Sequence, residues 1–214
     1  MKIKWFGHSC FIITSENGTK ILTDPYNNML DYRLPEIKAD IVTTSHDHSD
    51  HNNINAVNSN FVHINEKGCF SEHGIEIKGV ETFHDKVLGA EKGKNIIYNF
   101  KIDGINICHC GDLGHILNSN YVEEIGNVDI LLVPVGGGYT IDPFDAVEVR
   151  SQLKPTIVIP MHYRTEALGE KGHLFAKVDE FILASGLKAK EYSELELNKE
   201  TIKDYSGIAV LKYN

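Results

Sequence analysis

The chain has 214 residues, of which 42% are hydrophobic and 24% charged, as in ordinary globular proteins. Its formal net charge of -9 disfavours a general nucleic-acid-binding protein, which needs a basic surface. The N-terminal sequence lacks the apolar run of a signal peptide, and no later stretch could span a membrane. We therefore expect a cytoplasmic protein with one domain over residues 1–214 and four reduced, structural cysteines. Alternation places Cys108 and Cys110 on one strand face, and their roles are left open.

The first part of the chain is predicted to begin with three strands. They cover residues 2–6, 10–14 and 20–23. Gly7-His8-Ser9 makes a tight connection between the first two strands. Asn17-Gly18 predicts a hairpin turn before the third strand.

Further strands are predicted where β-branched and aromatic residues alternate or form short buried runs. They cover residues 39–45, 61–64, 75–77, 80–83, 95–102, 105–110, 128–133, 156–159, 188–192 and 207–211, with a break at Gly79. Helices are predicted over residues 52–60, 119–125, 143–153 and 173–185, with a helical turn over 66–71 and a mobile flap over 166–172. The helix start is clearest where Asp142 is an N-cap and Pro143 takes the first helical position.

The strand over residues 39–45 leads into the hexad His46-Asp47-His48-Ser49-Asp50-His51. Such a strand end is where α/β folds place their chemistry. His46 and His48 point the same way on an extended segment and could bind one ion, while Asp50 and His51 would face a second ion. Imidazole with carboxylate is the ligand set of catalytic zinc, and it also suits manganese and iron. The alternative is a solvated polar turn or a helix N-cap, which would account better for a single His-Asp pair than for the whole hexad.

The H-x-H-x-D-H hexad resembles the signature of the metallo-β-lactamase-fold superfamily of metal-dependent hydrolases. The opening of the chain, with G-H-S at residues 7–9, a hairpin and Asp24-Pro25, is similar to that of many members. The F-H-D context of His84 looks more like the branch of ascorbate-6-phosphate lactonases and N-acyl phosphatidylethanolamine phospholipase D. The resemblance implies an α/β fold, a four-layer αββα sandwich of two mixed β-sheets flanked by helices.

The resemblance also implies two divalent metal ions, most often Zn2+, with Mn2+ or Fe2+ as alternatives. The implied ligands are His46, His48 and His84 for one ion, Asp50, His51 and His162 for the other, and Asp112 between them. His84, Asp112 and His162 each follow a predicted strand, and the glycines beside Asp112 would let the backbone approach a ligand closely. His84 and His162 could instead be strand-end histidines without a metal.

Other residues are candidates for supporting or substrate-binding roles. In the resembled family, the residue corresponding to Asp24 buttresses the metal histidines and fixes their ring orientation; otherwise Asp24 is a turn former before proline. His8 would reach the substrate or the outer ion, or be a satisfied loop histidine. Tyr139 follows a glycine run beside the site, and Arg164, after Tyr163, is an anion anchor or an exposed loop arginine. Weaker candidates, left outside the ligand set, are His63, His73, His109 and His115.

The predicted enzyme is a dinuclear hydrolase that uses a metal-activated hydroxide on a small, anionic ester, lactone or phosphodiester. Its catalytic residues would be Asp50, His84 and Asp112, with Asp50 orienting the attacking water or taking its proton. The alternatives are a metallo-nuclease, which the acidic charge disfavours, a di-iron redox or sensor protein, whose relatives carry a carboxylate where His48 stands, and a non-catalytic binding module. The expected partner is a small-molecule substrate, with no membrane or nucleic acid, and a homo-oligomer is left open.

Overall fold

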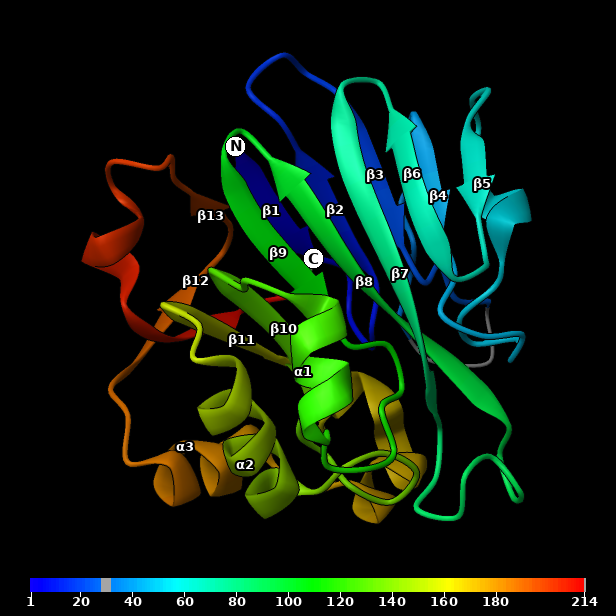
Figure 1. Ribbon diagram of the computed structural model, residues 1–214. Helices are drawn as coiled ribbons and strands as arrows, with labels where there is room; N and C mark the ends of the chain where they lie inside the picture. The colour runs from blue at the N-terminus through cyan, green and yellow to red at the C-terminus, as the bar shows by residue number, and fades with distance from the viewer. Residues whose placement is uncertain (28–31, 214) are drawn as a thin grey trace.

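The computed structural model describes residues 1–27 and 32–213, in which two β-sheets pack face to face (Figure 1). The first sheet contains, in spatial order, β13 (Leu195–Glu196), β1 (Lys2–Trp5), β2 (Phe11–Thr14), β3 (Lys20–Thr23), β4 (Ile41–Thr43) and β5 (Val62–Ile64). The second contains β12 (Ala189–Tyr192), β14 (Gly207–Leu211), β11 (Ile157–Met161), β10 (Ile130–Pro134), β9 (Ile105–His109), β8 (Lys94–Ile102), β7 (Ile75–Phe83) and β6 (Gly68–Glu72).

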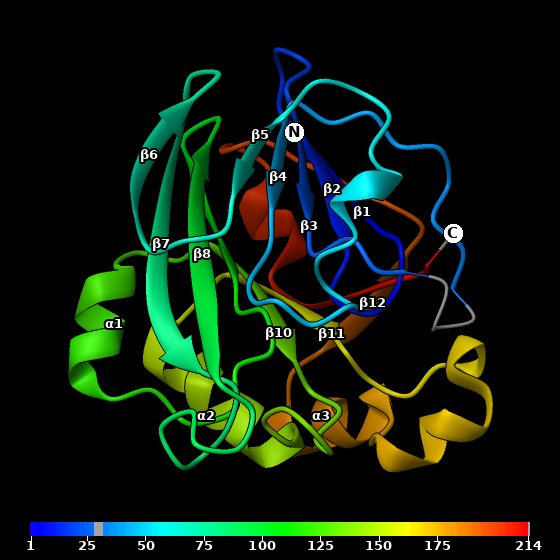
Figure 2. The same cartoon turned by 90° about the vertical axis from the view of Figure 1, so that its right-hand side faces the viewer.

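Helices flank this pair of sheets. The α-helices are α1 (Ser119–Ile125), α2 (Pro143–Leu153) and α3 (Val178–Ser185), and the 3-10 helices are η1 (Ile54–Ala56), η2 (Glu166–Leu174) and η3 (Ile202–Tyr205). Helix α1 contacts β7, α2 contacts β10, and α3 packs on α2, so the α-helices gather beside the second sheet (Figure 2). Both sheets contain parallel and antiparallel pairs, and the predicted fold of two mixed sheets with flanking helices is confirmed. No helix within the described ranges is long and apolar enough to cross a membrane.

The apolar core has two parts because successive side chains of a strand point to opposite faces of its sheet. Ile21 of β3 and Ile41 of β4 belong to the large cluster that fills the space between the sheets. Their neighbours Leu22 and Val42 belong to a smaller cluster with residues of the loop before β4 and with Leu168 of η2. The first sheet is therefore buried on both faces, which fixes the register of the strands that carry the site.

The strands that lead into the predicted site residues share one direction within each sheet. In the first sheet, β1 and β3 both pair antiparallel with β2, and β4 pairs parallel with β3. In the second sheet, β7 and β9 both pair antiparallel with β8, and β9, β10 and β11 are parallel. Their carboxyl ends therefore reach one edge of each sheet, the position expected for a site in an α/β fold. The loops after these strands carry His8, Asp24, the hexad, His84, Asp112 and His162.

The prediction of a helical turn over residues 66–71 was wrong, as was the predicted break at Gly79. Residues Gly68–Glu72 form β6, which pairs antiparallel with one continuous strand, β7. A Cβ atom at Gly79 would lie 2.7 Å from the Glu66 carbonyl oxygen. Glycine at this position lets the segment around Glu66 approach the strand closely. A glycine within a strand pattern can therefore mark a close contact and not the end of the strand.

The predicted helix over residues 173–185 begins only at Val178. Residues 166–174, which include the expected flap, form the 3-10 helix η2, interrupted at Gly169 with φ 51°. The expected helix over residues 52–60 is reduced to the short η1, and the two-residue strand β13 was not predicted. Leu174 thus lies in η2 and not in α3, and it is 48% exposed.

We expect Gly79→Ala to destabilise the fold, because its new methyl group would press on the Glu66 carbonyl and on the Tyr98 ring, 3.1 Å away. Overpacking of this kind costs about 1–3 kcal/mol of unfolding free energy. Urea unfolding of the variant would measure the loss, with Lys78→Ala on the same strand as the control. Equal stability of Gly79→Ala and the wild type would contradict this account.

Candidate metal centre

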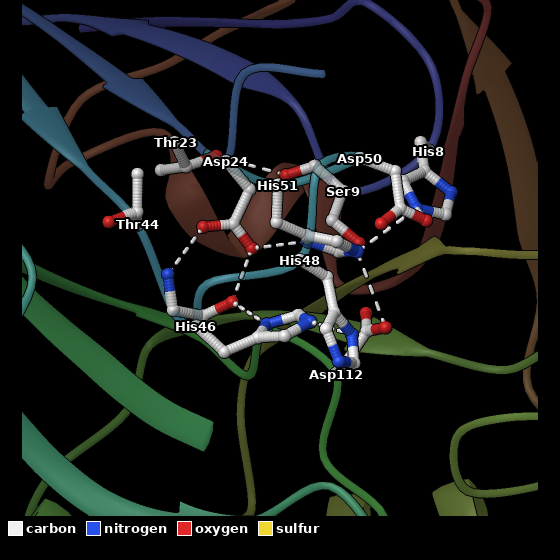
Figure 3. Close-up of polar contacts among 12 residues, drawn as sticks. His8, Ser9, Thr23, Asp24, Thr44, His46, His48, Asp50, His51 and Asp112 are labelled. Atoms are coloured by element: carbon white, nitrogen blue, oxygen red, sulfur yellow. Dashed lines mark hydrogen bonds and ion pairs between the residues drawn. The ribbon is translucent and has the colours of Figure 1, made fainter. Parts of the chain in front are cut away.

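The loops that follow the strand ends bring all of the predicted metal ligands together. Figure 3 shows the hexad residues His46, His48, Asp50 and His51 beside Asp112. One group of donors contains His46, His48 and His84, whose ligand atoms lie within 4.8 Å of one another. In this group, His46 Nε2 lies 2.9 Å from His48 Nδ1. Both of these histidines come from the hexad after β4, whereas His84 follows β7 on the other sheet.

A second group of donors lies beside the first and contains His8, His51 and His162, again within 4.8 Å. His8 Nε2 is 3.0 Å from His51 Nε2 and 3.4 Å from Asp50 Oδ2. From the sequence, His8 was a candidate for substrate or outer-ion contact with no fixed place. The fold puts this histidine among the donors predicted for the second ion.

Asp112 stands between the two groups. Its Oδ2 atom lies 3.2 Å from His84 Nε2, 3.3 Å from His51 Nε2 and 3.4 Å from His162 Nε2. Burial alone would raise the pKa of Asp112, but His162 and His51 hold this pKa well below its ordinary value. One ionised carboxylate oxygen therefore faces imidazoles of both groups, whereas Asp112 Oδ1 is buried with no hydrogen-bond partner among the described residues.

The spacing and state of these donors fit divalent cations. Ligand atoms about 2.0–2.1 Å from a tetrahedral zinc ion lie about 3.3–3.4 Å from each other, close to the separations around Asp112. Burial lowers the pKa of His46 to about 3 and that of His8 to about 4, so both imidazoles are neutral and offer a lone pair at neutral pH. Two ring nitrogens that face each other at 2.9 or 3.0 Å must otherwise share a proton, whereas a common cation accepts both lone pairs.

Asp24 supports the second donor group through its contact with His51. Its Oδ2 atom lies 2.9 Å from His51 Nδ1 and accepts a 2.6 Å hydrogen bond from Ser45 Oγ, while Oδ1 accepts from the Ser45 N–H at 2.8 Å. Burial alone would raise the pKa of Asp24, but its contact with His51 holds this pKa below the ordinary value. The carboxylate thereby turns His51 Nε2 toward Asp112, the supporting geometry described for metal-binding histidines.

Close backbone approaches, made possible by glycine, hold these loops together. A Cβ at Gly111 would lie 2.4 Å from Asn95 Oδ1 and 2.5 Å from Ser45 Cβ, so glycine brings the loops after β4 and β9 into contact. At Gly136 a Cβ would lie 2.1 Å from the His162 carbonyl oxygen. The glycines around the site are therefore needed for the approach of its loops.

Comparisons with known proteins identify the family. A sequence model described as the beta-lactamase superfamily domain matches residues 2–162. A UPF0173 metal-dependent hydrolase from Pelotomaculum thermopropionicum is 31% identical over 204 residues, which is 80% of this chain and 88% of that protein. The chain therefore belongs to the beta-lactamase superfamily.

Further relatives agree with the superfamily assignment. A UPF0173 metal-dependent hydrolase from Thermoplasma acidophilum is 30% identical over 191 residues, 77% of this chain and 84% of that protein. A crystal structure from Thermotoga maritima, assigned to the Zn-dependent hydrolases of the metallo-beta-lactamase superfamily, is 41% identical. It has a TM-score of 0.82 and covers 98% of this chain and 97% of that one. These relatives confirm the predicted class, a metal-dependent hydrolase of the superfamily.

In this superfamily member the donor groups open into a pocket of about 550 Å³. The predicted site residues in its lining are His8, His48, Asp50, His84, Asp112 and His162. The rest of the lining consists of Lys92, Tyr139, Leu168, Leu174 and Phe175. Tyr139 thus lies where it was expected, and Lys92 was missed, because Lys86, Lys92 and Lys94 cannot be told apart in the sequence of one loop.

Tyr163 and Arg164 are not placed at this pocket, so their expected contacts with substrate are not retained. The Tyr163 ring is buried 5.2 Å from the Trp5 ring, in the core between the sheets. Arg164 is exposed, and its backbone N–H donates to the Ala176 carbonyl oxygen. Tyr163 thus faces the core, away from the donor groups, and Arg164 fits the alternative of an exposed loop arginine.

The weaker histidine candidates lie outside both donor groups. His109 Nε2 bonds to the Ser9 carbonyl oxygen at 2.8 Å, and His63 Nε2 bonds to Thr44 Oγ1 at 3.0 Å. The four cysteines are free; Cys69 is exposed and the others are buried. None of the donor groups found in the described ranges contains a cysteine.

The loop that carries Lys92 is folded around Asp85, which entered the sequence analysis only as part of the F-H-D context of His84. Asp85 Oδ1 accepts from the N–H groups of Val87 and Gly89, and Oδ2 accepts from those of Glu91 and Lys92, at 2.7–3.0 Å. Although burial opposes ionisation, these bonds lower the pKa of Asp85 to about 2. The ionised carboxylate therefore fixes the loop that brings Lys92 to the pocket.

We expect Asp85→Asn to lower thermal stability at pH 7, because an amide oxygen cannot replace both carboxylate oxygens as acceptors. Since the pKa of Asp85 is lowered by folding, its stabilising effect is present above the unfolded pKa of about 4 and is lost as pH falls through about 2. The melting temperatures of the variant and wild type should therefore differ by a constant amount from pH 7 to about pH 5 and converge as pH falls from about 4 to about 2. A gap that stays constant over this lower range as well, or that appears equally in the exposed α1 control Glu123→Gln, would count against this role.

Proposed function

We propose that this protein is a dinuclear metal-dependent hydrolase of small, anionic esters, lactones or phosphodiesters. The observation that carries the proposal is the position of Asp112, whose one carboxylate oxygen faces imidazoles from both donor groups at 3.2–3.4 Å. A single ion would not need a second group of histidines on the far side of that oxygen. Two ions that share Asp112 would use every donor described.

The first ion would be held by His46, His48 and His84, and the second by Asp50, His51, His162 and His8. Asp112 would contact both. Imidazole and carboxylate donors suit Zn2+, and Mn2+ or Fe2+ would accept the same set. The donor set contains no thiolate, so softer metals are disfavoured.

Bound divalent ions supply an acidified water and a Lewis acid for the substrate oxygen. The chain's residues position the reacting groups around them. Asp50 lines the pocket, and although burial opposes its ionisation, the contact with His8 holds the pKa of Asp50 below its ordinary value. We assign to Asp50 the orientation of the attacking water or the acceptance of its proton.

The size and charge of the pocket favour a small substrate over a nucleic acid. Its volume of about 550 Å³ is typical of small-molecule sites. Lys92 is the one lysine or arginine that lines it among the described residues, whereas a nuclease needs a basic surface that follows a phosphate backbone. The net charge of -9 points the same way.

The proposal is tested by hydrolysis of a panel of lactones, carboxylic esters and phosphodiesters by the zinc- or manganese-loaded protein. We expect turnover of at least one class, and Asp112→Asn should reduce kcat by at least about 100-fold, the upper range for residues that only support metal ligands. Asp47→Asn is the matched control, because Asp47 belongs to the same hexad but is exposed and contacts Asn52. Absence of turnover on every class by fully loaded protein would refute the proposal.

Counting metal ions tests the assignment of His8. Wild-type protein should retain two ions per chain, whereas His8→Ala should bind its weaker ion about 10–100-fold less tightly, because one imidazole is lost from the second group. Elemental analysis after dialysis and calorimetric titration with Zn2+ would measure this, with His63→Ala on β5 as the control. Unchanged affinity for two ions in His8→Ala would show that His8 serves another purpose.

A further inference from the structure

Part of the lining of this pocket is apolar and open to water, and we call it the apolar wall. Leu168, Leu174, Phe175 and Tyr139 form this wall, and Leu174 is 48% and Tyr139 50% exposed. The Phe175 ring lies 5.2 Å from the ring of His162 and 6.0 Å from that of Tyr139. Large apolar side chains left exposed next to a polar centre mark a surface that a ligand covers.

This apolar wall is held in place by backbone contacts with the loop before α2. The Ala176 N–H donates to the Gly136 carbonyl oxygen at 2.7 Å. At Gly138, with φ +68°, a Cβ would lie 2.7 Å from the Leu174 carbonyl oxygen, so this close approach also depends on glycine. Since Gly136 in turn contacts His162, the wall and the second donor group keep a fixed separation.

Lys92 lines the same pocket. Its Nζ donates to the Tyr139 carbonyl oxygen at 3.1 Å and sits 4.4 Å from the centre of the Tyr139 ring. Asp85 accepts from the Lys92 N–H, and the contact with Tyr139 holds the ammonium group beside the apolar wall. Lys92 and His48 also line an adjoining polar groove that includes Glu66, Lys67 and Glu81.

We propose that the substrate is an amphipathic anion, with an apolar acyl or aryl group against Leu168, Leu174 and Phe175 and a carboxylate or phosphoryl group beside Lys92. The bond to be hydrolysed lies between these two parts, over His48 and Asp112. This inference rests on the proposed function and narrows its substrate class. It also assigns to Lys92 the role of anion anchor, which was one of two alternatives for Arg164 in the sequence.

The apolar wall is tested by chain length. The metal-loaded protein is assayed with p-nitrophenyl esters of straight-chain acids from two to ten carbons, and with alkyl p-nitrophenyl phosphates of the same lengths. Each methylene would be buried on one side only and would contribute about half the free energy of full burial. We therefore expect kcat/KM to rise about two-fold per methylene until the pocket is filled. Leu174→Gln should lose most of this increase, whereas Leu183→Gln, on an 85% exposed leucine of α3, should keep it. A kcat/KM that does not rise with chain length in either series would overturn the inference while leaving hydrolysis intact.

The anion contact is tested by charge. Lys92→Gln should lower kcat/KM about ten-fold for p-nitrophenyl monoesters of dicarboxylic acids, and much less for their neutral methyl esters. Lys94→Gln is the matched control, because Lys94 pairs with Glu81 and does not line the apolar pocket. p-Nitrophenyl esters of phosphonoalkanoic acids, assayed beside the dicarboxylic monoesters, separate a phosphoryl from a carboxylate source of the charge. Equal losses on charged and neutral esters would remove Lys92 from substrate recognition.

A binding measurement keeps the inference testable even without turnover. Calorimetry of the zinc-loaded protein with octyl phosphate and with inorganic phosphate compares the same anion with and without an apolar chain. Tighter binding of octyl phosphate, lost in Leu174→Gln and weakened in Lys92→Gln, supports the amphipathic substrate. Equal affinities for the two probes would refute it, and a failure of all hydrolysis with this preference intact would refute only the proposed function.

Discussion

The carboxylate of Asp112, buried among three imidazoles, is the interaction on which the rest of the site depends. A carboxylate with only 3% exposure is costly to bury unless charge and hydrogen bonds compensate. His51, His84 and His162 reach it from three separate loops, and each of these loops follows a different strand. The contacts of Asp112 therefore form only when both sheets are packed correctly against each other.

That packing is achieved at a local cost in backbone energy. His8, Asp24 and His162 all have positive φ values, of 52°, 39° and 52°, which side chains other than glycine adopt reluctantly. Strain of this kind costs about 1–3 kcal/mol per residue and persists only where the surroundings fix it. Here the Trp5 indole and the His162 N–H both donate to the His8 carbonyl oxygen, and the core between the sheets holds the strands on either side.

The two sides of the pocket have different origins. Its polar side is built from strand ends, which the fold places at a common edge and which carry the imidazole and carboxylate groups. Its apolar side comes from η2, from the segment that follows it and from the glycine loop before α2, none of which belongs to a sheet. Chemistry and substrate choice can thus vary separately, since a change in the second set leaves the donor groups in place.

The sequence by itself determined the elements whose signals are local. The hexad, the hairpin at Asn17-Gly18, the Asp142 cap of α2 and most strand positions depend on residues close together in the chain, so periodicity and turn chemistry suffice to predict them. The ligand candidates His84, Asp112 and His162 were recognisable because each follows a strand, with the resemblance to a family to assign their roles. Strand β6 was predicted as a helical turn because a short polar edge strand has no strong local pattern.

Only the tertiary structure decided which residues meet across the site. His8 lies beside His51, 43 positions away, because β1 and β4 run in the same direction, and no spacing rule links them. Lys92 lines the pocket because the backbone of its loop is bonded to Asp85. Arg164 does not line it, and its backbone N–H bonds to the Ala176 carbonyl oxygen instead. These placements depend on the packing of segments far apart in sequence, and such packing cannot be predicted from the residues next to one another in the chain.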